Sequence, residues 1–148
     1  MNKTYAILFG VLAIAAFSFF FWWPNPMNTQ AQSLVLPDGT VFEIEIAESS
    51  VDKTRGLSGR EELKEGTGML FVYPYPTEPV IWMPNMHFPI DIIWLRDHRI
   101  VTIVENAPPD DSSDRPRYRP TEPADRVLEV PAGTAQKHAL NLGDRLEY

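Results

Sequence analysis

An uncharged run of twenty residues, 4–23, divides this chain of 148 residues into two unequal parts. As an α-helix, a run of this length rises about 30 Å, which is enough to cross the hydrocarbon core of a membrane. Trp22 and Trp23 end the run, where indole rings prefer the membrane interface, and Pro24 cannot continue the helix. Lys3 is the only charged side chain before the run, so the N-terminal side is expected to stay in the cytoplasm. The sequence therefore predicts a transmembrane helix with the following domain outside the cytoplasm.

We expect a cytoplasmic stub at 1–3, a transmembrane signal anchor at 4–23, a polar linker at 24–33 and an extracytoplasmic domain at 34–148. A cleaved signal peptide, which would leave a secreted protein, is the alternative. Such peptides usually have an apolar region of about 7–15 residues. The best small-residue cleavage site ends at Ala31, well beyond the apolar run. A single-pass anchor in the cell membrane is therefore favoured.

The predicted domain is acidic and has no cysteine. Of the 13 basic residues 12 follow Gln32, as do all 20 acidic ones, so this part has a formal charge of 12 − 20, or −8. An acidic surface disfavours binding to nucleic acids and to anionic lipid. Without cysteine, disulfides and thiolate chemistry are excluded. The domain must rely on its hydrophobic core, which about 115 residues are able to form.

Short apolar runs separated by turn residues predict a mostly β domain. Leu34 to Leu36 and Thr40 to Ala47 flank the turn sequence Pro37-Asp38-Gly39, which is typical of a hairpin. Further strands are expected at 69–73, 80–83, 90–95, 100–105, 126–130 and near 147. The run 100–104 is apolar on both faces apart from Thr102, so we expect it to be a central strand.

Two short helices complete the expected fold. Ser49 and Asp52 match a capping box and predict a helix over about residues 50–57, and a second helix is expected within 131–141. The Pro-rich, charged segment 106–125 predicts a long exposed loop. With seven or eight short strands, the fold class is α+β with mostly β structure, an antiparallel sandwich or partly open barrel.

The aromatic, Pro-punctuated stretch 68–95 carries the main candidate site. Trp82, Asn85 and Asp91 are placed so that an indole, an amide and a carboxylate could hold a polar ligand such as a sugar ring. The alternative is structural, because a buried Asn or Asp can satisfy backbone groups of neighbouring loops. The sequence leaves both interpretations open.

Arg55 and Tyr73 extend this set of candidate ligand-binding residues. Arg55 and Arg60 flank Gly56-Leu57 and could clamp an anion, although surface salt bridges are the alternative. Tyr73, with Trp82 on the other side of a Pro-rich loop, could form an aromatic patch that stacks on a ligand or covers the core edge.

The sequence predicts no catalytic residue, metal site or cofactor. The three His residues show no HExxH or clustered pattern, and no DxDxDG calcium loop is present. No GxSxG elbow surrounds Ser58. A hydrolase that pairs Asp91 with a second carboxylate is the enzymatic alternative, and it requires the two groups within about 5–10 Å.

Several pieces in order carry a resemblance to a known family. They are Glu45-Ile46-Ala47, Arg55-Gly56-Leu57, Gly68-Met69-Leu70-Phe71-Val72, Trp82-Met83-Pro84-Asn85-Met86, Pro89-Ile90-Asp91-Ile92-Ile93-Trp94, Asn106-Ala107-Pro108-Pro109, Val127-Leu128-Glu129 with Gly133, and Gly143-Asp144. From about residue 34 to the end, the chain resembles domain-of-unknown-function family 192. The resemblance implies a compact, mostly β domain with a short helix at the Arg-Gly-Leu segment, often behind a signal or anchor, and it implies no particular reaction.

The chain departs from the family's pattern at several positions. Ser58 stands where the family commonly has Met, and Pro84 and Met86 stand where Lys and Thr are common around the Asn. Many members also have a cysteine pair near the Pro-Pro loop, where this chain has Asp110, Ser112 and Asp114. The loss of that Lys and Thr argues against a ligand that those two groups would contact.

Three functions follow as hypotheses. The favoured one is binding of a polar ligand or cell-envelope component by the 82–91 segment. The second is the hydrolase that uses Asp91. The third is a structural or partner-binding module, with no small-molecule site, that contacts a protein through the 106–125 loop.

Overall fold

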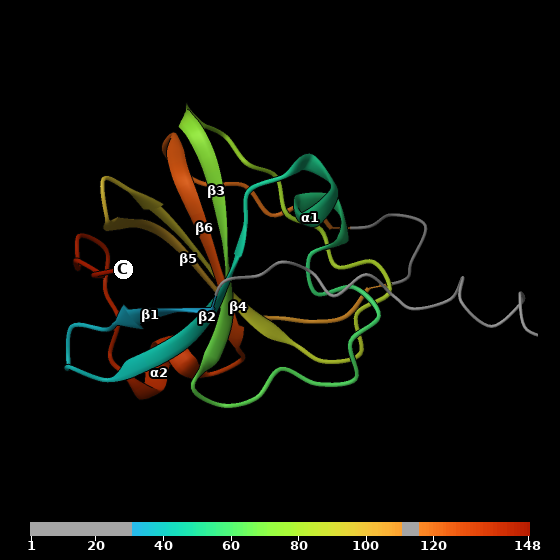
Figure 1. The fold of residues 1–148 in the computed structure, drawn as a ribbon, viewed down its shortest axis with the longest axis horizontal. Helices are drawn as coiled ribbons and strands as arrows, with labels where there is room; N and C mark the ends of the chain where they lie inside the picture. Colours follow the sequence, from blue (N-terminus) through green and yellow to red (C-terminus); the bar gives the residue numbers. More distant parts are fainter. Residues whose placement is uncertain (1–30, 111–115) are drawn as a thin grey trace, which may run out of the picture.

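The computed structural model describes residues 31–110 and 116–148 (Figure 1). The predicted anchor at 4–23, and nearly all of the predicted linker, lie outside the described residues. Within the described ranges, no helix has the length and apolar character needed to cross a membrane.

The described residues form one six-stranded sheet with two short helices. The strands are β1 (Ala31–Val35), β2 (Val41–Ala47), β3 (Thr67–Thr77), β4 (Ile90–Arg96), β5 (Arg99–Ala107) and β6 (Ala124–Pro131), and the helices are α1 (Ser50–Arg55) and α2 (Thr134–Lys137). Their order across the sheet is β1-β2-β3-β6-β4-β5 (Figure 1). The mostly β fold is thus confirmed, with fewer strands than expected.

The sequence suggested a purely antiparallel sheet, but one pair of strands is parallel. β2 and β3 pair in parallel, while the other neighbouring strands are antiparallel. The connection between β2 and β3 carries α1, because parallel neighbours need a crossover rather than a tight turn. This crossover places α1 over one face of the sheet (Figure 1).

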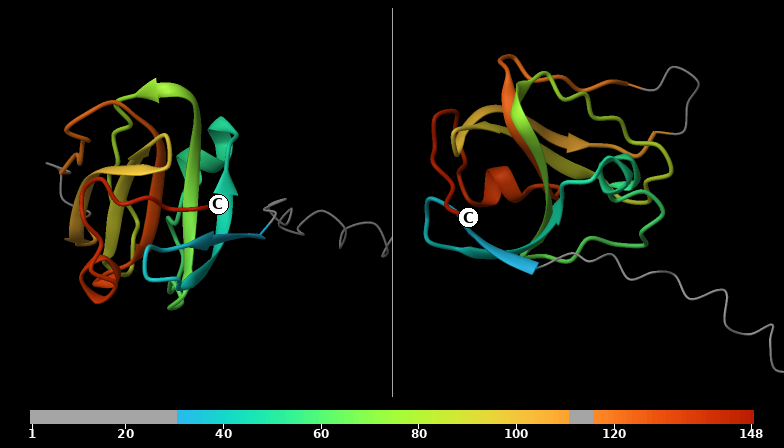
Figure 2. Two further views of the ribbon diagram at one scale, coloured as in Figure 1. Left: turned by 90° about the vertical axis from the view of Figure 1, so that its left-hand side faces the viewer. Right: turned by 45° about the horizontal axis from the view of Figure 1, so that its top comes forward.

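Two expected strands are reduced to isolated bridges. The segment 80–83 pairs only through Ile81 with Tyr118, because the prolines at 79 and 84 interrupt any longer ladder. Near the C-terminus, Glu147 bridges to Val35 of β1 and Arg145 bridges to Arg99 of β5. The C-terminal segment therefore touches both edge strands and joins them at one end of the sheet (Figure 2).

The expectation that residues 100–104 form a central strand is wrong, because β5 is an edge strand. Its apolar character on both faces has another cause. The loop after residue 115 packs against it, with the Thr121 backbone N–H donating to Thr102 Oγ1 at 2.9 Å and Thr121 Oγ1 donating to the Val101 carbonyl at 3.2 Å. The central position belongs instead to β6, between β3 and β4.

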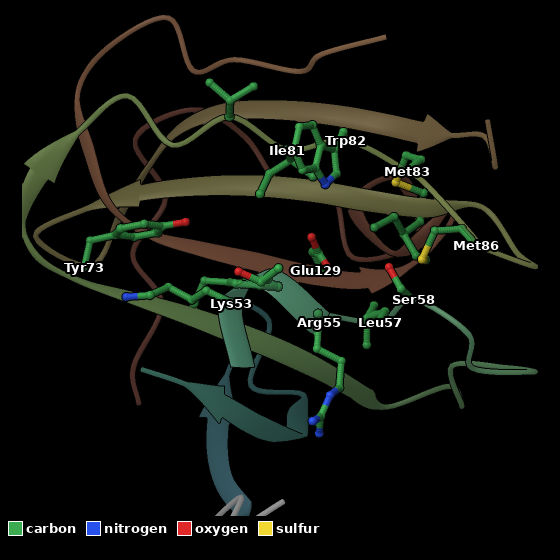
Figure 3. A pocket seen from close by; sticks show the side chains of 15 residues that line it. Lys53, Arg55, Leu57, Ser58, Tyr73, Ile81, Trp82, Met83, Met86 and Glu129 are labelled. Atoms are coloured by element: carbon green, nitrogen blue, oxygen red, sulfur yellow. The ribbon is translucent and has the colours of Figure 1, made fainter. Parts of the chain in front are cut away.

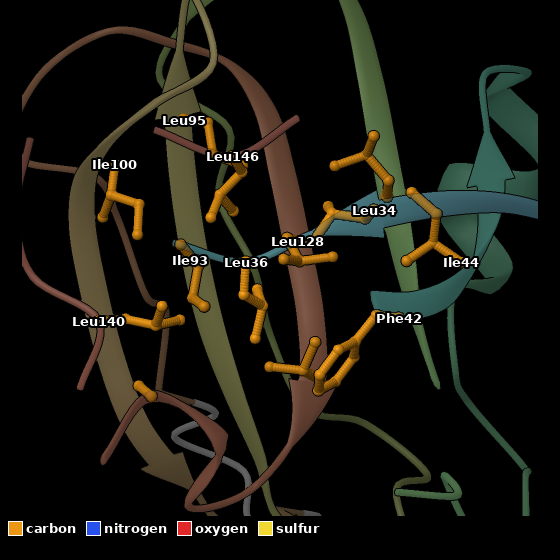
Figure 4. Packing of buried hydrophobic residues seen from close by; sticks show 13 residues of the cluster. Leu34, Leu36, Phe42, Ile44, Ile93, Leu95, Ile100, Leu128, Leu140 and Leu146 are labelled. Atoms are coloured by element: carbon orange, nitrogen blue, oxygen red, sulfur yellow. The ribbon is translucent and has the colours of Figure 1, made fainter. Parts of the chain in front are cut away.

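Both faces of the central strands are buried. Alternating residues such as Leu70, Ile93 and Leu128 point to one core, together with residues of the first hairpin and the C-terminal segment (Figure 4). The intervening residues, such as Met69 and Val127, point to a second core under the 79–88 segment and the α1 crossover. The candidate site lies on this second face.

Candidate functional site

A pocket of about 70 Å³ opens on the second face of the sheet (Figure 3). Its walls come from α1 and the turn after it, from β3, from the 80–86 segment, from the first residue of β4 and from β6. The lining residues are Lys53, Thr54, Arg55, Gly56, Leu57, Ser58, Phe71, Tyr73, Val80, Ile81, Trp82, Met83, Met86, Ile90 and Glu129. Most of these side chains are apolar or aromatic, which is typical of small-molecule sites. Pockets that enclose a drug-sized ligand have volumes of roughly 300–1,000 Å³. This pocket is far smaller, so it has room for only one end of such a ligand.

Glu129 is the buried acid of this pocket. β6 pairs Glu129 with Met69 of β3 and with Ile92 of β4, so strand alternation directs the carboxyl group into the second core. The residue is only 5% exposed. Among the described residues, no hydrogen bond or ion pair reaches its side chain, and it lines the pocket (Figure 3). The carboxyl group therefore lies in a largely apolar setting and faces the pocket rather than a protein partner.

Burial raises the pKa of Glu129 to about 8, and the positive charge of Arg60 opposes this rise. The cause is the loss of water around the carboxylate, which penalises the charged form. Glu129 is consequently mostly protonated at neutral pH. A buried group of this kind within a pocket is a candidate functional residue on physical grounds.

Lys53 lines the pocket from α1, but its charge is already engaged. Ser49 begins this helix by accepting a hydrogen bond from the Asp52 backbone N–H at 3.0 Å, as the capping box predicts. The Lys53 ammonium donates to the Val72 carbonyl at 2.9 Å and lies 4.7 Å from the centroid of the Tyr73 ring. Burial, and secondarily the charge of Glu129, raise the pKa of Tyr73.

Gly56 ends α1 at the pocket wall. Its φ of 49° lies in the region that favours glycine, and its N–H donates to the Asp52 carbonyl at 2.8 Å. A Cβ at this position would lie 3.4 Å from the ring of Phe71. A glycine here therefore lets the chain turn from the helix toward Leu57 and Ser58 while the turn stays close to the sheet.

Arg60, whose charge acts on Glu129, is itself paired with Glu45. Two nitrogens of the guanidinium donate to the two carboxylate oxygens at 2.5 and 2.7 Å. The pairing with Glu45 is the main cause that raises the pKa of Arg60. Because Glu45 engages two of the guanidinium nitrogens, the Arg60 charge acts on Glu129 through space and not through a bond.

Trp82 and Arg55 lie at the rim. Trp82 is 48% exposed, and the Arg117 guanidinium carbon lies 5.3 Å from the centroid of its ring. The segment is fixed by the Ile81–Tyr118 bridge and by the Trp94 indole N–H, which donates to the Pro79 carbonyl at 3.0 Å. Arg55 is exposed, and Figure 3 shows its guanidinium directed away from Glu129.

Asp91 lies outside the pocket and is completely buried. Its Oδ1 accepts hydrogen bonds from the N–H groups of Asn106 at 2.8 Å and Gly133 at 3.1 Å, and its Oδ2 accepts one from Ala135 at 2.8 Å. The carboxylate thereby joins β4, the end of β5 and the start of α2. This enclosure by backbone donors favours the structural interpretation of Asp91 and weighs against its use as a catalytic group.

Asn85 also lies outside the pocket lining. It is exposed, has a φ of 53°, and accepts a hydrogen bond from the Gly59 N–H on its backbone carbonyl at 2.8 Å. Next to it, Ser58 Oγ donates to the Pro84 carbonyl at 3.0 Å. These bonds attach the 83–86 turn to the α1 crossover and so hold one wall of the pocket in place.

The pocket thus brings together three of the predicted ligand-binding residues, Arg55, Tyr73 and Trp82, and leaves out Asn85 and Asp91. Sequence reasoning did not select Glu129 or Lys53. The available signal for Glu129 was a lone acidic residue inside the apolar strand sequence Val127-Leu128-Glu129-Val130. Within residues 31–110 and 116–148, no cluster of three or more potential metal-ligating side chains occurs.

Three comparisons place this chain among other proteins. The family DUF192, described as an uncharacterized ACR, matches residues 34–148, the range in which the motifs resemble that family. The comparison with curated proteins found no match.

Two solved structures are similar to the described fold. A protein of unknown function from Novosphingobium aromaticivorans is 30% identical with a TM-score of 0.76, and the match covers 84% of this chain and 90% of the other. A protein from Sinorhizobium meliloti, described as a proposed transcription regulator, is 32% identical with a TM-score of 0.69, and the match covers 78% of this chain and 89% of the other.

Proposed function

Because this chain belongs to domain-of-unknown-function family 192, whose description names no activity, we propose a function from its own pocket: the domain binds a polar ligand or a component of the cell envelope. Glu129 would contact a terminal group of the ligand inside the pocket, and Trp82 would stack on the part that remains at the rim. The small volume of about 70 Å³ fits this division between an enclosed end and an exposed remainder.

The observation that carries the proposal is the carboxyl group of Glu129, which faces the pocket and has no partner in the described part of the chain. A carboxyl group that reaches a pocket with no protein partner has its hydrogen bonds open to a ligand or to water. Asp91 shows that this fold can enclose a carboxylate with three backbone donors where no ligand is needed. Glu129 instead faces a pocket, where a ligand would supply the missing partner.

The cell envelope is the proposed location because of the segment at 4–23. An uncharged run of this length would anchor the chain in the membrane, with the domain on the outer side. Glycan and peptide fragments of the envelope are polar and carry sugar rings, which stack well on an exposed indole. The Sinorhizobium meliloti relative is described as a proposed transcription regulator, a role that usually involves DNA. The part of this chain after Gln32 has 12 basic and 20 acidic residues, a formal charge of −8, and so lacks the basic surface that DNA binding needs.

Titration of the full chain in mild detergent with defined cell-wall glycan fragments tests the proposal. Binding should change the fluorescence of Trp82 and shift the amide NMR signals of Leu57, Phe71 and Glu129. Trp82→Phe should remove the fluorescence change and weaken binding, since a phenyl ring offers a smaller stacking surface.

Tyr75→Phe is the matched control, because Tyr75 is 66% exposed and does not line the pocket. It should leave binding unchanged. If no fragment shifts the signals of pocket residues, or if Tyr75→Phe weakens binding as much as Trp82→Phe does, the pocket is not the site.

A further inference from the structure

We infer that the group recognised inside the pocket is an ammonium, so that the ligand is a primary amine or an amino sugar whose cationic end pairs with the Glu129 carboxylate. This inference rests on the proposed function, since it names the chemical class of ligand for the same pocket. It stands on three features of the site: the acid inside it, its walls and the behaviour of its aromatic rings.

The first feature is that no cationic side chain within residues 31–110 and 116–148 pairs with Glu129. Lys53 reaches the pocket, yet its ammonium is bound to the Val72 carbonyl and lies over the Tyr73 ring. Arg60 is held by both carboxylate oxygens of Glu45. Among the described residues, no ion pair to Glu129 is formed, so its carboxyl group is free to pair with a ligand.

The second feature is the wall around Glu129. Leu57, Phe71, Ile81, Met83 and Met86 give it an apolar lining. An ion pair gains strength where water is excluded, and the methylene groups next to an amine fit such a lining. A carboxylate ligand would instead be tolerated only while Glu129 is protonated, and the low-dielectric setting would expel it once Glu129 ionises.

The third feature is that the aromatic rings at the pocket already attract cations. Lys53 lies over Tyr73 at 4.7 Å, and Arg117 lies over Trp82 at 5.3 Å. Both rings line the pocket together with Glu129 (Figure 3). Aromatic faces recur in sites that recognise ammonium groups, and a ligand ammonium would compete with these two side chains for the rings.

Binding an ammonium must be coupled to loss of a proton from Glu129. The free carboxyl group is mostly protonated at neutral pH because burial raises its pKa to about 8. The charged groups around it are Lys53 and Arg55 from α1, Arg60 with Glu45 beyond it, and Tyr73 from β3, while β4 contributes apolar residues to this face. An arriving cation favours the ionised form, so one proton should be released for each amine bound.

Three small probes of nearly equal size separate the alternatives: propylammonium, propan-1-ol and propionate. With the full chain in detergent at pH 8, propylammonium should bind at least tenfold more tightly than the other two, as judged by amide NMR shifts of pocket residues. Its affinity should rise from pH 6 to pH 8 and level off until the amine itself deprotonates, near pH 10.4 by analogy with lysine. Calorimetry at pH 7 in buffers of different ionisation enthalpy should show release of close to one proton.

Glu129→Gln should weaken propylammonium binding at least tenfold and abolish both the pH dependence and the proton release. Glu43→Gln is the matched control, because Glu43 is exposed on β2 and lies outside this pocket. In the unmodified chain, the carboxyl ¹³C signal of Glu129 should report a lower apparent pKa when propylammonium is present, which tests the inference without any substitution.

Equal binding of propan-1-ol or propionate, or full retention of propylammonium binding by Glu129→Gln, would overturn the ammonium assignment. If glycan fragments shift the pocket signals in that case, the proposed function still stands. If neither the probes nor the glycan fragments perturb the pocket, both the inference and the proposed function fail.

Discussion

Asp91 and Glu129 are two buried carboxyl groups with opposite surroundings. Asp91 is 0% exposed and accepts three backbone hydrogen bonds, whereas Glu129 is 5% exposed and faces an apolar pocket without a bonded partner among the described residues. Hydrogen-bond donors stabilise a carboxylate, while desolvation alone destabilises it. The first group therefore holds the fold together, and the second is available for chemistry with a ligand.

Asp91→Asn should destabilise the domain by about 2–4 kcal/mol, since an amide offers one acceptor oxygen and turns an N–H₂ group toward backbone donors. Urea unfolding followed by circular dichroism measures this loss. Asp97→Asn is the control, because Asp97 is exposed in the β4–β5 turn with a φ of 50°, a conformation that Asn tolerates. A loss below about 1 kcal/mol for Asp91→Asn would show that the three bonds contribute little.

Glu129 should make the domain less stable as the pH rises from about 4.5 to about 8. In the unfolded chain the carboxyl group ionises near the ordinary glutamate pKa of 4.5, whereas burial raises its pKa to about 8 in the folded state. Between these values the folded state holds the extra proton, so raising the pH favours unfolding. Each tenfold difference in proton affinity is worth about 1.4 kcal/mol, so the effect amounts to several kcal/mol.

Glu129→Gln should remove this pH dependence and raise the melting temperature at pH 8 relative to the unmodified domain. Melting curves at pH 5 and pH 8 provide the measurement. Glu43→Gln, at an exposed position of β2, should leave the dependence intact. If Glu129→Gln behaves as the unmodified chain does at both pH values, Glu129 is not the group responsible.

At the scale of elements, α1 is short and depends on its cap. The helix spans six residues, none of which is buried, and Ser49 both accepts from the Asp52 N–H at 3.0 Å and donates to the Asp52 carboxylate at 2.5 Å. Most of the helix's stability must therefore come from its ends and from Lys53, which reaches across to β3.

Ser49→Ala should cost about 1 kcal/mol of stability and increase amide hydrogen exchange in α1. Because Lys53, Thr54 and Arg55 line the pocket, the same substitution should also weaken ligand binding. Ser50→Ala is the control, since the Ser50 side chain has no capping role and its backbone carbonyl remains to accept from Thr54 Oγ1. Equal effects of the two substitutions would contradict the role of the cap.

Local elements were predictable from the sequence because their causes are local. The Asp38-Gly39 turn, with Gly39 at a φ of 86°, and the capped start of α1 depend on residues within a few positions of one another. The parallel pairing of β2 with β3 and the edge position of β5 were missed, because they depend on which distant strands meet. Apolar character on both faces of β5 reflects cover by a loop and not a central position.

The contrast between local and long-range causes also explains which residues of the candidate site could be predicted. Arg55, Tyr73 and Trp82 line the pocket together, and each has a charged or aromatic side chain of the kind that often binds ligands. Asp91 has this property too, yet its partners Gly133 and Ala135 lie more than forty positions away and could not be foreseen. The role of Glu129 depends on the register of β6 between β3 and β4, which no local pattern in the chain specifies.

At the scale of the whole molecule, the predicted anchor makes a testable prediction about which side of the membrane each end of the chain lies on. An enzyme reporter that is active only outside the cytoplasm, fused after residue 148, should be active, and the same reporter after Lys3 should be inactive. Membrane fractionation should retain the full chain in the membrane at high salt, because an apolar segment of this length is held by hydrophobic burial. An inactive C-terminal fusion, or release of the domain into the medium, would contradict the anchored orientation.

The bridges of Glu147 to β1 and Arg145 to β5 have a consequence for how the domain is made. Leu146 is 0% exposed in the core that also holds Leu34, so residues from the start and the finish of the domain complete the same core. β6, synthesised after β3 and β4, must likewise insert between them. The sheet therefore cannot be completed while the last residues of the chain are still within the ribosome. Such long-range pairing is slow to form, so the chain must stay free of misfolding and aggregation until its final segment is available.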